Sequence, residues 1–334
     1  MTNSLDTSIS RRTALTLLGS ASLSLAVGLP LSADDSRSDM LRNLLPTFSE
    51  KSRALLQRVL QGAYSGQISA ADAAELARLE NSNMDTLMVR MLPLAQSFSR
   101  APVSKFYVGV VVRGESGALY TGANIEIPGQ CLGFAVHAEQ SALANAYMHG
   151  ERGVAALAVG GAPCGHCRQF INEMSPAGEI SILTPDKPPV SLRAILPAAF
   201  GPAALGRKDG ALPVKESGLI LAKTSGDAIT AAALDAARES YAPYSKSPSG
   251  VAIRSRSGRI YRGSYIENVA FNPSLSPLQT ALAGMIAGGE PYSSIAAVML
   301  VEVQGATISQ KPVTGIVLGA IAPDVKLEVA IALA

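Results

Sequence analysis

The sequence predicts an α/β protein in which helices cover β-sheets, with this unit present twice behind a small helical domain. Three observations predict it. Leucines recur at helical spacing over residues 36–100, and strand-like and helix-like segments alternate after residue 104. The pattern of the second part then returns from Ser245 onward. A chain of 334 residues is long enough for such an arrangement.

Residues 1–33 have the composition of an export signal. Arg11 and Arg12 precede an apolar run over residues 14–31, and a polar stretch follows. The paired arginines resemble a twin-arginine (Tat) signal, although Ala14 and Thr16 depart from that pattern. We therefore expect a periplasmic protein, with a cytoplasmic protein that has an apolar N-terminus as the alternative. The run is short for a permanent anchor, so no stable membrane association is expected.

The elements up to residue 205 follow from periodicity. Residues 36–100 are expected to form a helical domain, with Ser69 as a helix N-cap. Residues 101–205 are expected to form the chemically active domain. The segments expected there are a hairpin around "GESG", a helix in "HAEQSALANAYMHG", a buried strand in "VAALAVGG", a helix in "CGHCRQFINEM" and a strand in "EISILTP". Proline-rich residues 186–216 are expected to form a linker or covering loop.

The second half repeats the scaffold of the first without its chemistry. Residues 206–224 are expected to be a linker and 225–334 the second copy. When the two halves of the sequence are aligned, Gly109 matches Gly250 and Gly122 matches Gly263. Glu126 likewise matches Glu267. On the same alignment, His137-Ala138-Glu139 faces Pro277-Leu278-Gln279, and no cysteine follows Cys167. The second copy is therefore predicted to be catalytically inert.

Three residues of the first copy are candidate zinc ligands. His137, Cys164 and Cys167 supply one imidazole and two thiols, which leaves a fourth position open, as in catalytic rather than structural zinc sites. A helix N-terminus at the cysteines would favour their thiolates. A disulfide redox pair and a purely structural zinc site are the alternatives, and neither explains the nearby Glu139.

Glu139 lies two positions after His137, close to the expected metal. A carboxylate there can move a proton from water to a leaving group. The combined pattern H-x-E…P-C-x-x-C is the signature of zinc-dependent nucleobase deaminases.

With these motifs, the chain resembles the homodimeric two-domain cytidine deaminases of bacteria over roughly residues 40–334. The strings "VHAEQSA", "APCGHCRQF", "PYSKSPSGVA" and "ENVAFNP" carry the resemblance. It implies a three-layer α/β/α cytidine deaminase-like fold, duplicated into a catalytic and a degenerate copy. It also implies one Zn²⁺ per chain and hydrolytic deamination of cytidine and 2′-deoxycytidine in pyrimidine salvage.

The resemblance also implies roles for other residues. Asn124 and Glu126 would recognise the ribose, Phe106 would lie against the pyrimidine, and the backbone at Ala138 would contact the base. Ala270 and Phe271 would reach the active site of the other subunit of a homodimer.

Composition weighs against other partners. The net charge of +2 provides no broad basic surface, so a free nucleoside is expected rather than a nucleic acid. A deaminase of bases in RNA or DNA and a non-catalytic nucleoside-binding protein are the alternative functions.

Overall fold

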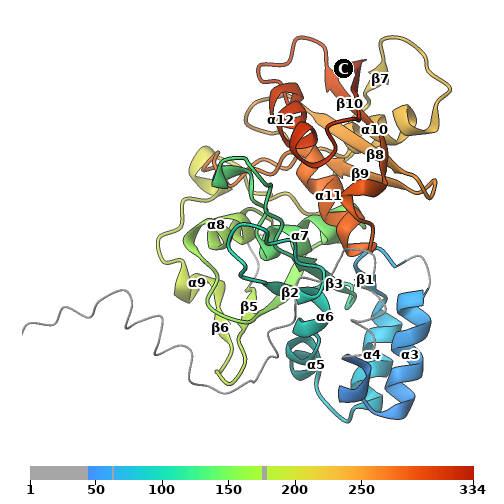
Figure 1. Ribbon diagram of the computed structural model, residues 1–334. Coiled ribbons are helices and arrows are strands. Elements are labelled where there is room, and N and C mark those ends of the chain that lie inside the picture. Colours follow the sequence, from blue (N-terminus) through green and yellow to red (C-terminus); the bar gives the residue numbers. More distant parts are fainter. Residues whose placement is uncertain (1–43, 62–63, 175–178) are drawn as a thin grey trace, which may run out of the picture. The chain divides into compact units, whose positions relative to one another are not determined.

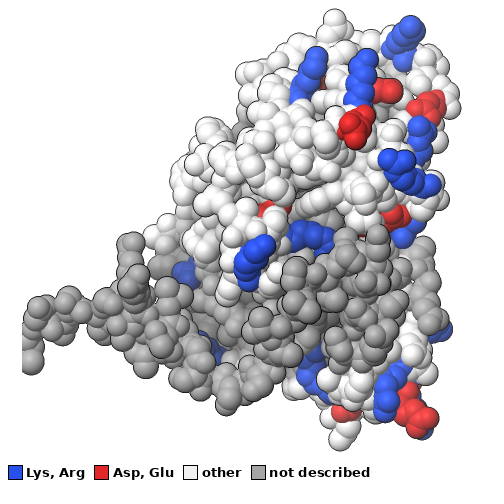
Figure 2. Space-filling model, viewed as in Figure 1, with Lys and Arg blue, Asp and Glu red and all other residues white. Residues whose placement is uncertain are grey.

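The computed structural model describes residues 44–61, 64–174 and 179–334 (Figure 1). The expected signal segment, residues 1–33, lies outside these residues. Among the residues described, none of the helices has both the length and the apolar character that crossing a bilayer requires. On the face in Figure 2, Lys and Arg side chains of the described surface are interspersed with Asp and Glu and with wide uncharged areas.

The described part of residues 36–100 is mainly helical, as predicted. Its helices are η1 (Leu45–Thr47), α3 (Glu50–Gln61), α4 (Ala70–Leu79), α5 (Met84–Arg90) and α6 (Leu92–Gln96). Ser69 caps α4 as expected, because its hydroxyl accepts the backbone N–H of Asp72 at 3.1 Å. The segment also contains β1 (Gln67–Ile68), a short strand that the helical pattern did not predict.

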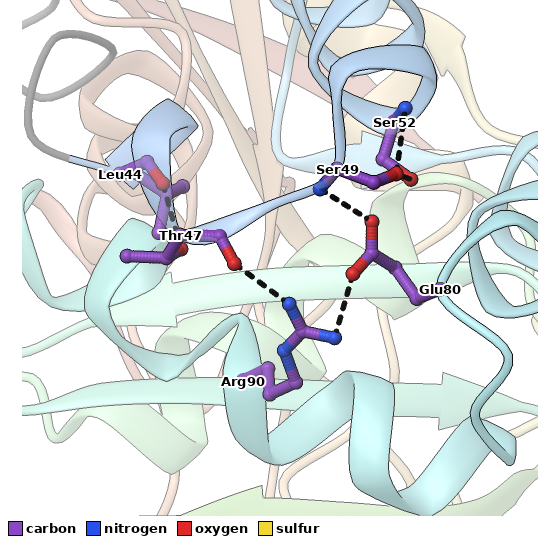
Figure 3. A network of polar contacts seen from close by, with 6 residues as sticks. All are labelled: Leu44, Thr47, Ser49, Ser52, Glu80 and Arg90. Atoms are coloured by element: carbon purple, nitrogen blue, oxygen red, sulfur yellow. Dashed lines mark hydrogen bonds and ion pairs between the residues drawn. The ribbon is translucent and has the colours of Figure 1, made fainter.

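A network of hydrogen bonds around a carboxylate connects the segment before α3 with the ends of α4 and α5 (Figure 3). Glu80 accepts the backbone N–H of Ser49 at 2.9 Å and lies 2.8 Å from the Arg90 guanidinium. Arg90 also donates to the carbonyl oxygen of Thr47 at 2.8 Å. Because these groups come from α4, α5 and the segment before α3, the network fixes the three helices relative to one another.

The first copy is built on a six-stranded sheet of order β1-β3-β2-β4-β5-β6. Its further strands are β2 (Gly109–Gly114), β3 (Leu119–Ala123), β4 (Val154–Val159), β5 (Ser181–Leu183) and β6 (Val190–Ser191). The β2–β3 hairpin is the one predicted around "GESG", and β4 and β5 are parallel neighbours. The helices of this copy are η2 (Leu132–Phe134), α7 (Ala138–Met148), α8 (Gly165–Met174), α9 (Leu192–Ile195) and η3 (Pro202–Leu205).

Close helix approach at two glycines shows that helices cover both faces of this sheet. A Cβ at Gly109 would lie 2.2 Å from the backbone of Gln96 in α6. A Cβ at Gly122 would lie 2.1 Å from the backbone of Ala142 in α7. Gly122 pairs with Val110, the neighbour of Gly109, and successive residues of a strand point to opposite faces. The sheet therefore lies between α6 and α7, the three-layer arrangement that was expected.

The second copy repeats this arrangement on a five-stranded sheet of order β7-β11-β10-β8-β9. Its strands are β7 (Ile220–Leu221), β8 (Ser249–Ser255), β9 (Ile260–Ser264), β10 (Ile295–Val303) and β11 (Leu327–Leu333). Its helices are α10 (Ala228–Arg238), α11 (Pro277–Ala287), η4 (Tyr292–Ser294) and α12 (Lys311–Ile321). Gly250 approaches α10 and Gly263 approaches α11, which confirms their predicted match with Gly109 and Gly122. Helix α6 thus occupies in the first copy the place of α10 in the second.

The expected match of His137-Ala138-Glu139 with Pro277-Leu278-Gln279 is wrong by one residue. His137 is the N-cap of α7, and the N-cap of α11 is Ser276. Eight residues, 268–275, precede Ser276 where ten, 127–136, precede His137, and this shorter loop shifts the register. Ser276 therefore replaces the histidine and Leu278 replaces Glu139, so the second copy still lacks both groups.

Helices α7 and α11 join the two copies through a reciprocal pair of hydrogen bonds. The Gln140 side chain donates to the carbonyl oxygen of Pro273 at 3.1 Å. The Gln279 side chain donates to the carbonyl oxygen of Phe134 at 2.7 Å. The two glutamines hold the third position of their helices, so the contact has approximate twofold symmetry. One hydrophobic core extends through both copies and the N-terminal helices.

Candidate zinc and nucleoside site

His137 stands at the start of α7, the helix that packs against β2 and β3. Its backbone N–H donates to the Gln140 side chain at 3.2 Å, which fixes the first turn. Val136, immediately before it, pairs with Ile125 in an isolated β-bridge. The imidazole is therefore held between a helix N-terminus and the end of the β3 segment.

Cys164 and Cys167 lie at the N-terminus of α8, which follows the buried strand β4. Cys164 immediately precedes the helix and is exposed, whereas Cys167 lies in the first turn and is buried. The backbone N–H of Cys167 points to the Cys164 sulfur, 3.5 Å away. A hydrogen bond from the Cys167 thiol lowers the pKa of Cys164 to about 4. Donating that bond raises the pKa of Cys167, and burial raises it further.

The three predicted ligands converge on one point. His137 Nδ1 lies 3.5 Å from the Cys164 sulfur and 3.3 Å from the Cys167 sulfur. Their ligand atoms all lie within 4.8 Å of one another. Tetrahedral zinc, with its usual bonds to imidazole nitrogen and thiolate sulfur, places such atoms about 3.5 Å apart. The donor set and its spacing therefore fit a zinc ion with one open position.

Glu139 lies on the same first turn of α7 and is 6% exposed. Burial raises the pKa of its carboxyl group above the ordinary value, although a hydrogen bond with Cys167 and the nearby His137 act in the opposite direction. A carboxyl group with a raised pKa beside a metal site is suited to accept and return a proton.

Comparison with known proteins places the chain in a family. The family described as the cytidine and deoxycytidylate deaminase zinc-binding region matches residues 82–183 and again residues 192–315. A cytidine deaminase of Vibrio vulnificus is 42% identical over 82% of this chain and 92% of its own length. One of Vibrio cholerae is 44% identical with the same coverage. The chain belongs to the cytidine deaminase family.

Among solved structures, the chain is similar to a cytidine deaminase from Mycobacterium tuberculosis. The two are 29% identical, and the match covers 35% of this chain and 96% of that one, with a TM-score of 0.32.

Asn124 and Glu126, the residues that the deaminase resemblance assigned to the ribose, organise the segment 103–108. The Asn124 side chain accepts the backbone N–H of Val108 and donates to the carbonyl oxygen of Phe106, both at 2.9 Å. Glu126 accepts the N–H groups of Val103 and Ser104 at 2.8 and 2.9 Å, and also the Ser104 hydroxyl. Burial raises the pKa of Glu126, but these hydrogen bonds outweigh it and lower that pKa below its ordinary value.

The remaining residues with predicted substrate or subunit contacts differ in exposure. Phe106 is 70% exposed and Phe271 is 67% exposed, and Ala270 beside it is also exposed. Ala138 is buried and is the first residue of α7, directly after His137. No described contact joins Ala270 or Phe271 to the zinc group of the same chain.

Two residues beside the cysteine ligands support the zinc group. The His166 ring stacks on the His137 ring with centroids 5.3 Å apart. Arg168 donates to the carbonyl oxygens of Pro163 and Ile195 at 2.7 and 2.8 Å, which holds the loop before Cys164 against α9.

The second copy of the deaminase fold keeps the scaffold of the substrate segment. Glu267 accepts the N–H groups of Tyr244 and Ser245 at 2.7 and 3.2 Å, as Glu126 does for Val103 and Ser104. Lys246 has a φ of 57° where Lys105 has 56°. Tyr265, however, stands in the place of Asn124, so the loop geometry survives without the amide.

Proposed function

We propose that the chain catalyses the hydrolytic deamination of cytidine and 2′-deoxycytidine to uridine and 2′-deoxyuridine with release of ammonia. The observation that carries this function is the convergence of His137, Cys164 and Cys167 beside the buried Glu139. The relatives named above as cytidine deaminases span most of the chain at 42–44% identity. The reaction is consistent with a role in pyrimidine salvage.

His137, Cys164 and Cys167 would hold the zinc ion. When bound, zinc lowers the pKa of a water molecule and makes it a nucleophile near neutral pH. Glu139 accepts the proton that this water loses and donates it to N3 of the cytosine ring. The water oxygen adds to C4. Glu139 then takes the proton of the added hydroxyl group and delivers it to the exocyclic amino group, so that the C4–N bond breaks, ammonia leaves and C4 becomes a carbonyl.

The segment organised by Asn124 and Glu126 would bind the rest of the nucleoside. The resemblance to the deaminase family assigns ribose recognition to the Asn124 amide and the Glu126 carboxylate. Exposed Phe106 would lie against the pyrimidine ring, and the backbone at Ala138 would contact its polar edge. Glu126 is suited to accept hydroxyl hydrogen bonds because its lowered pKa keeps it ionised at neutral pH.

The substitution Glu139→Ala tests the proton transfer. The variant should keep its zinc and lose about 10²–10⁴-fold in kcat for cytidine, the usual contribution of a general acid–base group. Glu50→Ala, on the exposed side of α3, is the matched control and should keep both zinc and activity. A zinc-loaded Glu139→Ala variant with normal turnover would refute the assigned role.

We further propose that the protein is a homodimer in which Ala270 and Phe271 complete the partner's active site. Large apolar side chains are left exposed at Val103, Phe106 and Leu132 as well as Phe271, which is typical of surfaces that a partner covers. Asn268 and Val269 hold the loop rigidly, because their polar groups bind Gln169 and Glu173 of α8.

Mixing two inactive variants tests this arrangement. Phe271→Asp disables the loop and Glu139→Ala disables the zinc site. After the two are unfolded and refolded together in equal amounts, heterodimers of an isologous pair should restore about one quarter of the wild-type activity. If Phe271 serves its own chain, or the chain is a monomer by light scattering, mixing will restore nothing.

We also propose that residues 1–33 direct the protein to the periplasm through the twin-arginine route. N-terminal sequencing of the mature protein and cell fractionation test it. A shortened, periplasmic protein that becomes cytoplasmic on substitution of Arg11 and Arg12 by Lys is the expected result. A full-length cytoplasmic protein would contradict it.

A further inference from the structure

A cavity that the zinc group does not line lies between the linker and the second copy. Its volume is about 410 Å³, within the range of small-molecule sites. One wall comes from linker residues, among them Arg207 and Lys215, and another from the segment Ser240–Pro248. None of the residues assigned to zinc or to the nucleoside lines it. Within the segment Ser240–Pro248, residues 244–248 are the second copy's counterpart of residues 103–107 in the proposed substrate-binding segment.

The cavity is lined by three cationic side chains, Arg207, Lys215 and Lys246, and by no Asp or Glu side chain. Lys215 binds Asp209 at 2.6 Å, outside the lining. Within the described part of the chain, Arg207 and Lys246 have no ion-pair partner, although the terminal residue Ala334 lines the same cavity. Positive charge therefore exceeds negative charge around the cavity.

The Arg207 side chain is held in place, but one of its hydrogen-bond donors has no partner. Its guanidinium carbon lies 5.8 Å from the centre of the Tyr241 ring, and Tyr241 is in turn fixed by donating its hydroxyl to Glu173 at 2.8 Å. The Arg207 Nε is buried and has no hydrogen-bond partner. A ligand in the cavity cannot reach this buried nitrogen, so an acceptor from outside the chain would bind the terminal nitrogens of the guanidinium group, which is held in place by Tyr241.

The lining favours a particular class of acceptor. Arg presents several donors that match the oxygens of a phosphoryl group, and Lys adds a point charge. Tyr147, Tyr241 and prolines such as Pro243 supply apolar surface beside these charges. We propose that this cavity binds a phosphate-bearing anion, either inorganic phosphate or a nucleoside monophosphate, with Arg207 and Lys246 as the residues that bind the phosphoryl oxygens.

Isothermal titration of the full chain with inorganic phosphate and with cytidine 5′-monophosphate tests the proposal. Excess uridine is present to occupy the zinc site. Arg207→Ala and Lys246→Ala should each weaken binding at least tenfold, whereas Lys208→Ala, exposed and outside the lining, should bind as the wild type does. Binding should also weaken as NaCl is added, because the attraction is between charges.

The two ligands distinguish the sources of the phosphoryl group. If the nucleotide binds more tightly than phosphate, the apolar side chains of the lining contact the nucleoside part of the nucleotide. If the two bind equally well, the cavity is a site for the free phosphate ion. Should Arg207→Ala fail to fold, the exposed position 246 carries the test alone, through Lys246→Glu. Absence of binding at millimolar concentrations, or binding that both variants leave unchanged, would overturn the proposal. Cytidine turnover is measured separately. It should be the same in the wild type and in the cavity variants, so this test and the test of the deaminase function can fail independently.

Discussion

The Tyr244 hydroxyl of the second copy donates a hydrogen bond to Glu173 of α8 at 2.5 Å. The same carboxylate oxygen accepts the Tyr241 hydroxyl at 2.8 Å, and the other oxygen accepts the N–H of Val269 at 2.9 Å. Glu173 is fully buried. The helix that begins with the zinc ligands is therefore anchored, near its other end, to the degenerate copy.

We expect Glu173→Gln to lower the free energy of unfolding by about 1–3 kcal/mol, because the amide group leaves at least one buried donor without an acceptor. Urea unfolding followed by circular dichroism measures the change. Tyr244→Phe removes one donor but leaves the carboxylate with two, so its effect should be smaller. Equal effects of the two substitutions would contradict this account.

Glu126→Gln and Glu267→Gln form a matched pair, because the two carboxylates hold equivalent loops. Both should lose stability, since each accepts backbone N–H groups. Only Glu126→Gln should raise KM for cytidine, by about tenfold, which corresponds to about 1.4 kcal/mol of binding free energy. Steady-state kinetics and thermal unfolding on the same preparations separate the two effects. A similar rise in KM for Glu267→Gln would show that loop stability alone matters.

Substitution of the thiols tests the metal site directly. Cys164→Ser and Cys167→Ser should each reduce the zinc content of the purified protein, measured by mass spectrometry, from about one per chain to a small fraction. Cys131→Ser is the control, because Cys131 is exposed and lies outside the group of potential ligands. Two zinc ions per wild-type chain, or zinc retained after both substitutions, would contradict the assignment.

The network around Glu80 predicts a defined pH dependence of stability. Burial raises the pKa of Glu80, but hydrogen bonds from Ser52, Ser49 and Arg90 outweigh it and lower that pKa to about 2. The folded-state pKa lies below the ordinary value of 4.5, so the stabilisation is complete above pH 4.5 and is lost as the pH falls towards 2.

The stability difference between wild type and Glu80→Gln, about 1–3 kcal/mol, should therefore be constant from pH 5 to 8. It should shrink as the pH falls through 4 towards 2. Urea unfolding at a series of pH values measures it. A difference that persists unchanged at pH 2 would show that the charge of Glu80 does not matter.

The zinc group and its helices were predictable because local patterns specify them. The spacing in "HAE" and "PCGHC" determines which residues share a first helical turn. Ser69 marks a helix start because its side chain caps the first turn. Gly150, the last residue of the predicted segment "HAEQSALANAYMHG", follows the end of α7 with a positive φ of 71°. The predicted matches of Gly109 and Gly122 with the second copy also held, because helices approach the strands too closely at these positions for any side chain.

Other features depend on contacts that no local pattern encodes. The one-residue error at Ser276 arose because the length of a loop, not its composition, sets the register there. Helix α6 spans only five residues, so its role as the counterpart of α10 becomes visible only from its packing on Gly109. The cavity beside Arg207 joins a linker to a distant loop, and such a juxtaposition has no signal in the sequence.

The reciprocal bonds of Gln140 and Gln279 have an evolutionary reading. Two identical chains related by a twofold axis would make this same contact, each glutamine reaching the other chain's loop. Fusing such chains turns an encounter that depends on protein concentration into an intramolecular one of high effective concentration. Once the pairing no longer required two interchangeable partners, mutations could remove the metal ligands from one of them without loss of assembly. In the present chain the inert copy acts as a permanent subunit, covalently supplied to the active one.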